Sequence, residues 1–323
     1  MKQIFIATNT LEVHNTEEVV RLLRRAGHDP IIYNADEVFA GRKLLTYTFD
    51  SRAARPVVRY DGQELSPETV GAAWYWRPNG FFAEPPKDKG RMMTLGRELF
   101  SLQSGIFQAA IPEGAWLNNP HRMHRANDKL WQLEVARSVG FTIPTTAVSN
   151  TWAAVTTLSP PIIMKMVIGQ VFNGDQSKLL YTTLLDSQKM TAVKDVSPFP
   201  GIFQQYVKKA REWRITMVAG RAFPVAIYTT ESAKADWRRP TLPEGAVRYV
   251  HEPADPAVIQ KCREYMRKTG LRYGAFDLIE SPDGAIAFLE MNTNGQFRGF
   301  EIKTEGLTIS QAIAQKLIAL AAR

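Results

Sequence analysis

The chain has 323 residues, of which 45% are hydrophobic, with one cysteine and a formal net charge of +8. Such a chain can bury a large core in two or three lobes, and its single cysteine excludes an internal disulfide and disfavours structural zinc. The positive charge favours an anionic partner such as a nucleotide or an acidic peptide. We expect no nucleic-acid partner, since no clustered aromatic-basic motif is present, and no membrane span; the expected compartment is the cytoplasm.

The first third of the chain has the pattern of an α/β unit. An apolar strand over residues 2–7 precedes a helix over 16–26, and Gly27 ends this helix before a second strand over 30–33. Such a unit is typical of doubly wound sheets. It lacks the glycine fingerprint of a dinucleotide site, so we interpret it as architectural. The pattern then predicts a small antiparallel addition, a returning strand and a helix, over 44–64, 72–78 and 91–109.

The returning strand, AAWYWRP, allows two interpretations of its large side chains. Trp74 and Trp76 are typical of core or interface packing. Arg77, directly before Pro78, could instead point into a cleft at the strand end and hold an anion.

The middle of the chain places two lysines in different settings. A helix opened by Asn127 or Asp128 begins near Lys129, which on its own would be an ordinary surface lysine. Lys165 interrupts an apolar strand over 162–166, and because lysine is rarely buried without a partner, a phosphate is a reasonable occupant there. The helix also carries Leu130, Leu133 and Ala136, and the neighbouring expectations are a strand over 144–148 and a hairpin or mobile flap over 169–178.

Three more strands are predicted, over 203–207, 212–218 and 223–228. In the second of them Glu212 and Arg214 alternate with apolar residues and so share a face. An ordinary solvent-side ion pair between them would contribute under about 1 kcal/mol.

The stretch YGAFDLIESPDGAIAFLEMNTNGQF predicts a hairpin with strands over 275–279 and 285–289, joined by a Ser-Pro-Asp-Gly turn. Asp277 lies inside the first strand, and Glu290 and Asn292 follow the second at alternate positions, so all three can face one side. Two carboxylates and an amide carbonyl suit Mg²⁺. Solvent-facing strand charges are the alternative, but Asp and Asn are disfavoured in strands. Helices over 256–270 and 309–321 complete the chain.

These patterns resemble the ATP-grasp ligases, in which an Asp and a Glu-x-Asn hold the magnesium ions of ATP. The resemblance rests on the order Asn-Pro, Asp-Lys, helix, and on the hairpin signature at the end of the chain. It implies Asp277, Glu290 and Asn292 as magnesium ligands. It also implies that the nucleotide is bound by Lys129, Lys165 and Glu212 and by the linker residues Gln204, Gln205, Tyr206 and Val207, mainly through the backbone of the linker.

The Asp-Trp-Arg at 236–238, together with AAWYWRP and LEMNTNGQF, narrows the resemblance to the graspetide synthetases, the microviridin-type ATP-grasp ligases that macrocyclise ribosomally made peptides. The likeness extends essentially end to end. It implies an α/β chain with an ATP-grasp fold and an N-terminal pre-ATP-grasp α/β domain, and it implies a homodimer. The expected divisions are residues 1–118 for the N-terminal domain, 119–202 for the central lobe and 203–323 for the C-terminal lobe.

The activity implied by this resemblance is an ATP-dependent and Mg²⁺-dependent ligation. Side-chain carboxylates of a precursor peptide, which has a leader and an acidic core, would be activated as acyl phosphates. Thr or Ser hydroxyls would then form ω-esters, or Lys amines ω-amides. Arg214 and Arg298 are the candidate catalytic residues for stabilising the activated group, and Asp236 and Glu301 are candidates for the base of the second step. The alternatives are an ATP-grasp ligase that adds a free amino acid or amine, and an ATP-binding regulatory module without ligase chemistry.

Overall fold

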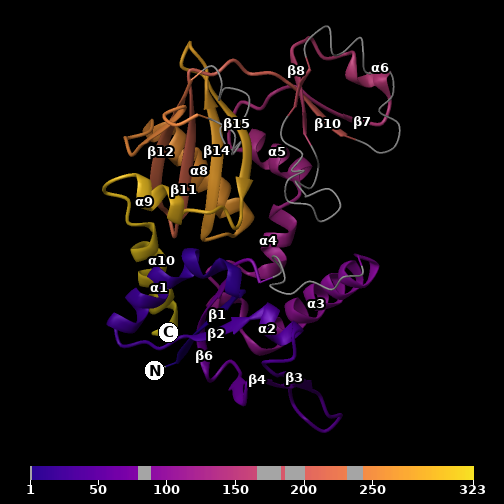
Figure 1. Ribbon diagram of the computed structural model, residues 1–323, viewed down its shortest axis with the longest axis vertical. Coiled ribbons are helices and arrows are strands. Elements are labelled where there is room, and N and C mark those ends of the chain that lie inside the picture. Colours follow the sequence, from indigo (N-terminus) through magenta and orange to yellow (C-terminus); the bar gives the residue numbers. More distant parts are fainter. Residues whose placement is uncertain (1, 79–88, 166–182, 186–200, 231–242) are drawn as a thin grey trace.

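The computed structural model describes residues 2–78, 89–165, 183–185, 201–230 and 243–323. In Figure 1 the N-terminal third forms a lower lobe, and two further sheets stand above it. The flap expected over 169–178 and the Asp-Trp-Arg segment at 236–238 lie outside the described residues.

The lower lobe is built on a parallel sheet with the strand order β2-β1-β6. Alternation along the first strand buries Phe5 and Ala7 on one face and Ile4 and Ile6 on the other, and both faces are covered. Phe5 packs edge-on against Phe107 of α3, with ring centroids 5.0 Å apart. The elements are β1 (Gln3–Thr8), η1 (Thr10–Glu12), α1 (Val13–Arg25), β2 (Ile31–Asn34), α2 (Ala35–Phe39), β6 (Val70–Tyr75), α3 (Lys89–Ala110) and η2 (Glu113–Ala115).

A small antiparallel sheet extends this lobe, as the sequence predicted. Its strands are β3 (Leu45–Thr48), β4 (Val57–Tyr60) and β5 (Gln63–Leu65).

The face of the lower sheet opposite α3 is covered by α1 together with the last helix of the chain, α10 (Ile309–Ala321). Figure 1 shows α10 descending from the upper part of the molecule to lie beside α1. The approach is close, because a Cβ added at Gly71 would meet the backbone of Ala321 at 2.9 Å. The two ends of the chain therefore share one core, and the predicted division at residues 118, 202 and 323 stays a prediction.

The second sheet is antiparallel, with the order β7-β10-β8-β9. Ile162 and Phe203 are buried in its own small core together with Leu185. The chain reaches this sheet through two consecutive helices. The elements are α4 (Pro120–Ala126), α5 (Lys129–Ser138), β7 (Thr146–Ser149), α6 (Trp152–Val155), β8 (Ile162–Lys165), β9 (Thr183–Leu185) and β10 (Gly201–Gln205).

The third sheet is antiparallel, with the order β13-β12-β11-β14-β15. Trp213, Ile215 and Phe276 lie on its covered face and pack with Cys262 and Tyr265 of α8. At one end of the opposite face Val218, Phe223 and Val225 pack with α10, and farther along the alternate positions carry polar side chains. The elements are β11 (Arg211–Val218), β12 (Arg221–Thr229), β13 (Val247–Val250), α8 (Pro256–Thr269), β14 (Tyr273–Glu280), β15 (Ile286–Asn292) and α9 (Arg298–Lys303).

Several predicted boundaries require correction. The strand expected over 203–207 runs from Gly201 to Gln205, so Tyr206 and Val207 follow it. The second hairpin strand continues to Asn292, which places Glu290 and Asn292 inside the strand rather than after it. In the described ranges no helix combines the length and the apolar character that crossing a membrane requires.

An arginine network closes one end of the third sheet. Arg211 donates from Nε and Nη2 to the two carboxylate oxygens of Glu280, at 2.8 and 3.1 Å, and from Nη1 to Tyr228 at 2.8 Å and to Glu252 at 2.5 Å. The Trp213 indole donates to Glu280 as well, at 2.8 Å. Burial alone would raise the pKa of Glu280, but the hydrogen bonds from Arg211 and Trp213 outweigh burial and hold that pKa below its usual value.

This shift predicts how stability depends on pH. A carboxylate whose pKa is lower in the folded state stabilises the fold above its ordinary pKa, and the contribution is lost as the pH falls through the folded-state value. We expect wild type to be more stable than Glu280→Gln at pH 7, with the difference shrinking below about pH 4.5. Urea unfolding of both proteins from pH 7 to pH 3 measures this, with the exposed Glu64→Gln as the control. A difference that stays constant over this range would contradict the assignment.

Candidate active site

The open face of the third sheet brings together the three residues proposed as metal ligands. Asp277 of β14 lies directly opposite Glu290 of β15. The Asn292 amide donates to Asp277 at 3.1 Å and to Glu290 at 3.3 Å. We call Asp277, Glu290 and Asn292 the acidic cluster.

A β-bulge makes this arrangement possible. The register between β14 and β15 shifts beside Asp277, where Leu278 pairs with Phe288 while Asp277 pairs with Glu290. Leu289 is therefore the extra residue. Without it, simple alternation from the buried Phe288 would turn Glu290 toward the core.

Arg214 extends the row onto the neighbouring strand. It pairs in register with Asp277 and donates to that carboxylate at 2.7 Å. Nη2 of Arg214 donates to the carbonyl of Gln296 at 3.3 Å, and Arg214 as a whole is 7% exposed. Burial alone would lower the pKa of Arg214, but the charge and the hydrogen bond of Asp277 outweigh burial and raise that pKa above its usual value. Arg214 is thus a fixed positive charge beside two carboxylates.

Lys129 approaches the cluster from the start of α5. Its Nζ lies 3.5 Å from a carboxylate oxygen of Glu290, and about a quarter of each side chain is exposed. The side chain of Asp128 caps this helix by accepting from the N–H groups of Leu130 and Trp131. The positive end of the helix dipole disfavours a lysine at a helix N-terminus. The negative charge of Glu290 offsets this effect at Lys129.

Gln132, which the sequence analysis did not single out, fixes α5 against β15. Its amide donates to the carbonyl of Met291 at 2.9 Å and accepts from the N–H of Met291 at 3.0 Å, and it also donates to Ala126 at 2.7 Å. The residue is 4% exposed. Met291 lies between Glu290 and Asn292, so Gln132 holds the backbone of both ligands. Helical spacing could have indicated Gln132. Residues three apart share a helix face, and Gln132 lies three positions after Lys129.

Gly295 allows the loop after β15 to lie against Arg214. A Cβ at this position would come within 2.5 Å of Arg214 Nη2 and within 2.5 Å of the Cβ of Ala275. The Tyr273 hydroxyl also donates to the carbonyl of Gly295. The close approach explains the glycine in the Asn-Gly-Gln-Phe segment.

Gly295→Ala is therefore expected to displace Arg214 and to reduce catalytic turnover at least about tenfold, because small displacements of a positioning group are costly. Gly299→Ala is the matched control, since a Cβ there meets nothing within 4 Å. Steady-state phosphate release measures the effect. Equal activity of the two variants would show that Arg214 does not depend on this packing.

Glu212 and Arg214 do not form the ion pair that one interpretation of the strand proposed. Glu212 pairs with Lys209, a lysine whose side chain is 5% exposed, whereas Arg214 pairs with Asp277. The register explains this difference, because Asp277 lies directly opposite Arg214 and Lys209 lies just before the same strand. The buried lysine was missed because nothing in its local sequence marks it as buried.

The remaining nucleotide-binding candidates lie on the second sheet. Lys165 ends β8, opposite Ile202 of β10, and its side chain is partly buried. Gln204 is 2% exposed and donates to the hydroxyl of Thr146 at 2.9 Å, whereas Gln205 is exposed.

The linker backbone is only partly engaged. The N–H of Gln205 donates to Thr145 at 2.9 Å and the N–H of Tyr206 to Pro161 at 3.0 Å. Within the described ranges the N–H of Val207 has no backbone acceptor, so of these linker N–H groups it is the one available to a ligand.

Arg298 and Glu301 are engaged with each other on α9. Arg298 donates to Glu301 at 2.9 Å, and Glu301 accepts from the N–H of Ser310 at 2.8 Å and from its hydroxyl at 2.5 Å. Three donors thus occupy the carboxylate that was a candidate base, and they tie α9 to the start of α10. Asp236, the other candidate base, lies outside the described residues.

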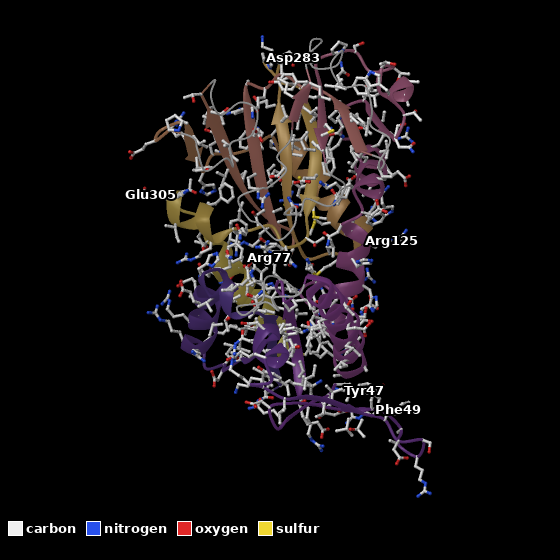
Figure 2. All side chains as sticks on the ribbon, turned by 45° about the vertical axis from the view of Figure 1, so that its right-hand side comes forward. Tyr47, Phe49, Arg77, Arg125, Asp283 and Glu305 are labelled. Carbon is white, nitrogen blue, oxygen red and sulfur yellow. The ribbon has the colours of Figure 1, made fainter. Side chains whose placement is uncertain are left out.

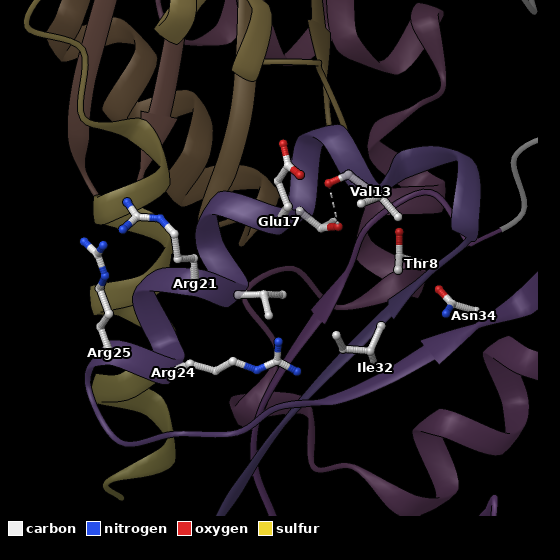
Figure 3. A pocket seen from close by; sticks show the side chains of 10 residues that line it. Thr8, Val13, Glu17, Arg21, Arg24, Arg25, Ile32 and Asn34 are labelled. Atoms are coloured by element: carbon white, nitrogen blue, oxygen red, sulfur yellow. Dashed lines mark hydrogen bonds between the residues drawn. The ribbon is translucent and has the colours of Figure 1, made fainter.

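A hollow of about 600 Å³ lies elsewhere, between α1 and β2 (Figure 3). Val20 and Ile32 line it, and two of its arginines are already paired, Arg21 with Glu18 and Arg24 with Asp29. The acidic cluster contributes no residue to it. We therefore place the candidate active site on the open face of the third sheet and not in this hollow.

No protein-family model matches the sequence, and no curated protein matches it. Solved structures do match over nearly the whole chain. The macrocyclase MdnC from Microcystis aeruginosa MRC, bound to its precursor peptide MdnA, is 23% identical with a TM-score of 0.83, over 98% of this chain and 99% of that one. A RiPP-associated ATP-grasp ligase from Chryseobacterium gregarium, in complex with ADP and a leader and core peptide, is 25% identical with a TM-score of 0.81, over 99% and 97%. The chain has the ATP-grasp fold.

A third ATP-grasp ligase, PsnB, solved with a precursor variant, Mg and ADP, is 21% identical with a TM-score of 0.77, over 99% of both chains. The predicted fold class, an ATP-grasp fold behind an N-terminal α/β domain, is confirmed, and so is the resemblance to peptide-modifying ATP-grasp ligases at the level of the fold.

Proposed function

We propose that this chain is an ATP-dependent ligase that joins side chains within a ribosomally made precursor peptide. The observation that supports this most is the row Arg214, Asp277 and Glu290 across three strands of an ATP-grasp fold, with Lys129 on Glu290. Solved ATP-grasp structures similar to this chain contain precursor peptides, ADP and Mg. Phosphoryl transfer requires basic side chains near the phosphates and, beside them, carboxylates that bind the metal ion.

The acidic cluster fits magnesium by its donor chemistry. Two carboxylates and an amide oxygen are hard ligands of the kind Mg²⁺ prefers, and the amide of Asn292 would turn its oxygen toward the metal. In the described ranges no three or more His, Cys, Asp or Glu side chains are grouped so that they could hold a metal ion. Two carboxylates alone suit a metal that also binds phosphate oxygens. Magnesium bound there would neutralise charge that develops on the phosphates.

The chemistry can be written as two displacements. A Glu or Asp carboxylate of the peptide attacks the γ-phosphorus, the bond from phosphorus to the bridging oxygen breaks, and ADP leaves. In this proposal Arg214 stabilises negative charge on the transferred group, and Lys129 and Lys165 bind the phosphates. We keep Arg298 as a candidate for the same task, and Glu212 and the linker residues 204–207 for the nucleotide.

In the second displacement a Thr or Ser hydroxyl, or a Lys amine, attacks the acyl carbon and loses its proton, and inorganic phosphate leaves. The formation of each ring therefore removes one molecule of water from the peptide. An ester and an amide differ only in the attacking atom.

The test is the intact mass of an acidic peptide encoded beside the gene, after reaction with the purified chain, ATP and Mg²⁺. We expect the loss of one water per ring, and mild alkaline hydrolysis should restore the mass if the bonds are esters. Incorporation of a free amine without any peptide would instead indicate the broader ligase activity. Nucleotide binding without phosphate release would indicate a regulatory module.

A homodimer in the cytoplasm belongs to the same proposal and rests on the similarity of the fold. Light scattering on the purified chain tests the dimer. A monomer at all concentrations would remove that part without affecting the proposed chemistry.

A further inference from the structure

Arg77 has a backbone conformation that its sequence disfavours. Its φ is +51°, which is uncommon for a residue other than glycine, and Pro78 favours extended backbone at the residue before it. The other described non-glycine residues with positive φ, Asp61 and Ala219, each precede a glycine in a two-residue hairpin turn, where this conformation is expected. Arg77 has no such turn, so contacts with other segments must hold it.

Neighbouring segments supply these contacts. The N–H of Trp76 donates to Ala7 at 2.8 Å and prolongs the parallel sheet. The Asn9 amide donates to the carbonyl of Arg77 at 2.8 Å, and Arg77 Nη1 donates to Glu12 at 2.8 Å. The backbone and one nitrogen of Arg77 are therefore fixed by the segment after β1.

Glu12 uses its carboxylate to orient the arginine. It also accepts from Asn15 at 2.8 Å and from the Trp76 indole at 3.2 Å, and its side chain is 9% exposed. The side chain of Arg77 is 36% exposed, and in the described ranges its Nε and Nη2 have no hydrogen-bond partner. One edge of the guanidinium is thus held, and the other edge is available.

Arg77 lies where open parallel sheets bind ligands. The chain passes from β1 to β2 on one side and returns as β6 on the other, and ligands bind outside the carboxyl ends of strands at such a switch point. Figure 2 labels Arg77 at the junction between the lower lobe and the sheets above. Trp76 packs edge-on against Tyr273 and Phe297, with ring centroids 5.7 and 5.5 Å apart.

Arg77 and Arg214 belong to opposite lobes, and the charges of both act on Tyr273. Burial raises the pKa of Tyr273, and the charges of Arg214 and Arg77 both oppose this. The loop after β15 separates the two arginines, because Phe297 contacts Trp76 while the carbonyl of Gln296 contacts Arg214. Arg214 is hydrogen-bonded to Asp277 of the acidic cluster, where the proposed phosphates lie, which leaves Arg77 for the other substrate.

We propose that the open edge of Arg77 binds a side-chain carboxylate of the acidic core of the precursor peptide. This rests on the proposed function and adds a residue of the N-terminal lobe to the peptide site. A planar guanidinium can bind a carboxylate through two parallel hydrogen bonds, which a lysine cannot do. Arg77 is a binding and positioning residue in this proposal.

The test measures the binding of the acidic peptide encoded beside the gene, in the presence of ADP and Mg²⁺. Arg77→Gln should weaken binding about tenfold or more, since hydrogen bonds between charged groups have that magnitude. Affinity for ADP should not change, and binding is measured well below the melting temperature, which should fall modestly because Glu12 loses one of its three donors. Arg77→Lys, which keeps the charge, should also weaken binding. Arg55→Gln is the control, because Arg55 is an exposed arginine of the same lobe paired with Glu68.

A double-mutant cycle identifies the contact. A peptide whose core Glu and Asp residues are replaced by Gln and Asn should bind equally to wild type and to Arg77→Gln. If Arg77→Gln weakens both peptides equally, or neither, the inference is overturned. If wild type converts the peptide and Arg77→Gln binds it with unchanged affinity, only the inference fails. If wild type neither binds nor converts the peptide, the proposed function fails with it.

Discussion

Asp277→Asn is expected to abolish ligase activity and also to lower the stability of the fold. The substitution keeps the shape of the side chain but removes a charged ligand from the acidic cluster. Turnover should fall about a thousandfold or more, because a bound metal supplies several kcal/mol of transition-state stabilisation. Arg214, which is 7% exposed, would also lose the charge of its partner.

The loss of stability follows from that second effect. Removing one partner of a buried ion pair costs about 3–5 kcal/mol. Glu290 remains in the same row and its charge also acts on Arg214, so we expect about 2–3 kcal/mol. Urea unfolding without nucleotide or metal isolates this effect from metal binding.

Glu290→Gln is the matched control for Asp277→Asn. It removes the other carboxylate of the cluster, so activity should fall by a similar factor. Its partner Lys129 is 26% exposed, and such a pair contributes about 1 kcal/mol or less. Glu290 also acts on Arg214 only through its charge, without a direct hydrogen bond, so stability should fall by less than in Asp277→Asn. Equal loss of stability in both variants would contradict the role given to Arg214, and retained activity in either would contradict the metal site.

The acidic cluster could be predicted from the sequence because its residue types conflict with their setting. Asp277 and Asn292 stand in apolar strand sequence, where such side chains are disfavoured. The β-bulge at Leu289 could not be predicted, because it depends on which residues the partner strand presents. The pairing of Arg214 with Asp277 joins residues 63 apart in the sequence, and alternation gives the face of a side chain but not its neighbour.

The helix α5 shows a second limit of sequence-based prediction, which concerns the choice of its buried residues. In this helix Leu130 is 45% exposed while Gln132 is 4% exposed. A buried glutamine is favoured here only because an open strand edge offers it a donor and an acceptor at Met291. Local patterns rank apolar residues as core, so a polar residue that completes a sheet edge is missed.

Gln132→Leu is expected to destabilise the fold and to raise the magnesium concentration that the reaction needs. The leucine would leave the N–H and the carbonyl of Met291 buried without their partners. An unsatisfied buried group costs about 1–3 kcal/mol, and we expect about 2–4 kcal/mol for the two together. Gln260→Leu is the control on an exposed helix face, where the change should stay within about 0.5 kcal/mol.

The magnesium effect separates a positioning role from a purely structural one. Met291 lies between Glu290 and Asn292, so freeing its backbone should loosen both ligands at once. Loss of outer partners of a metal site typically costs about 10–100-fold in affinity. Titrating Mg²⁺ into the ADP complex of the folded variant, well below its melting temperature, measures this directly. If unfolding shifts as expected while the magnesium affinity stays at the wild-type value, Gln132 only holds α5 to the sheet, and the geometry of the acidic cluster is set by β14 and β15 alone.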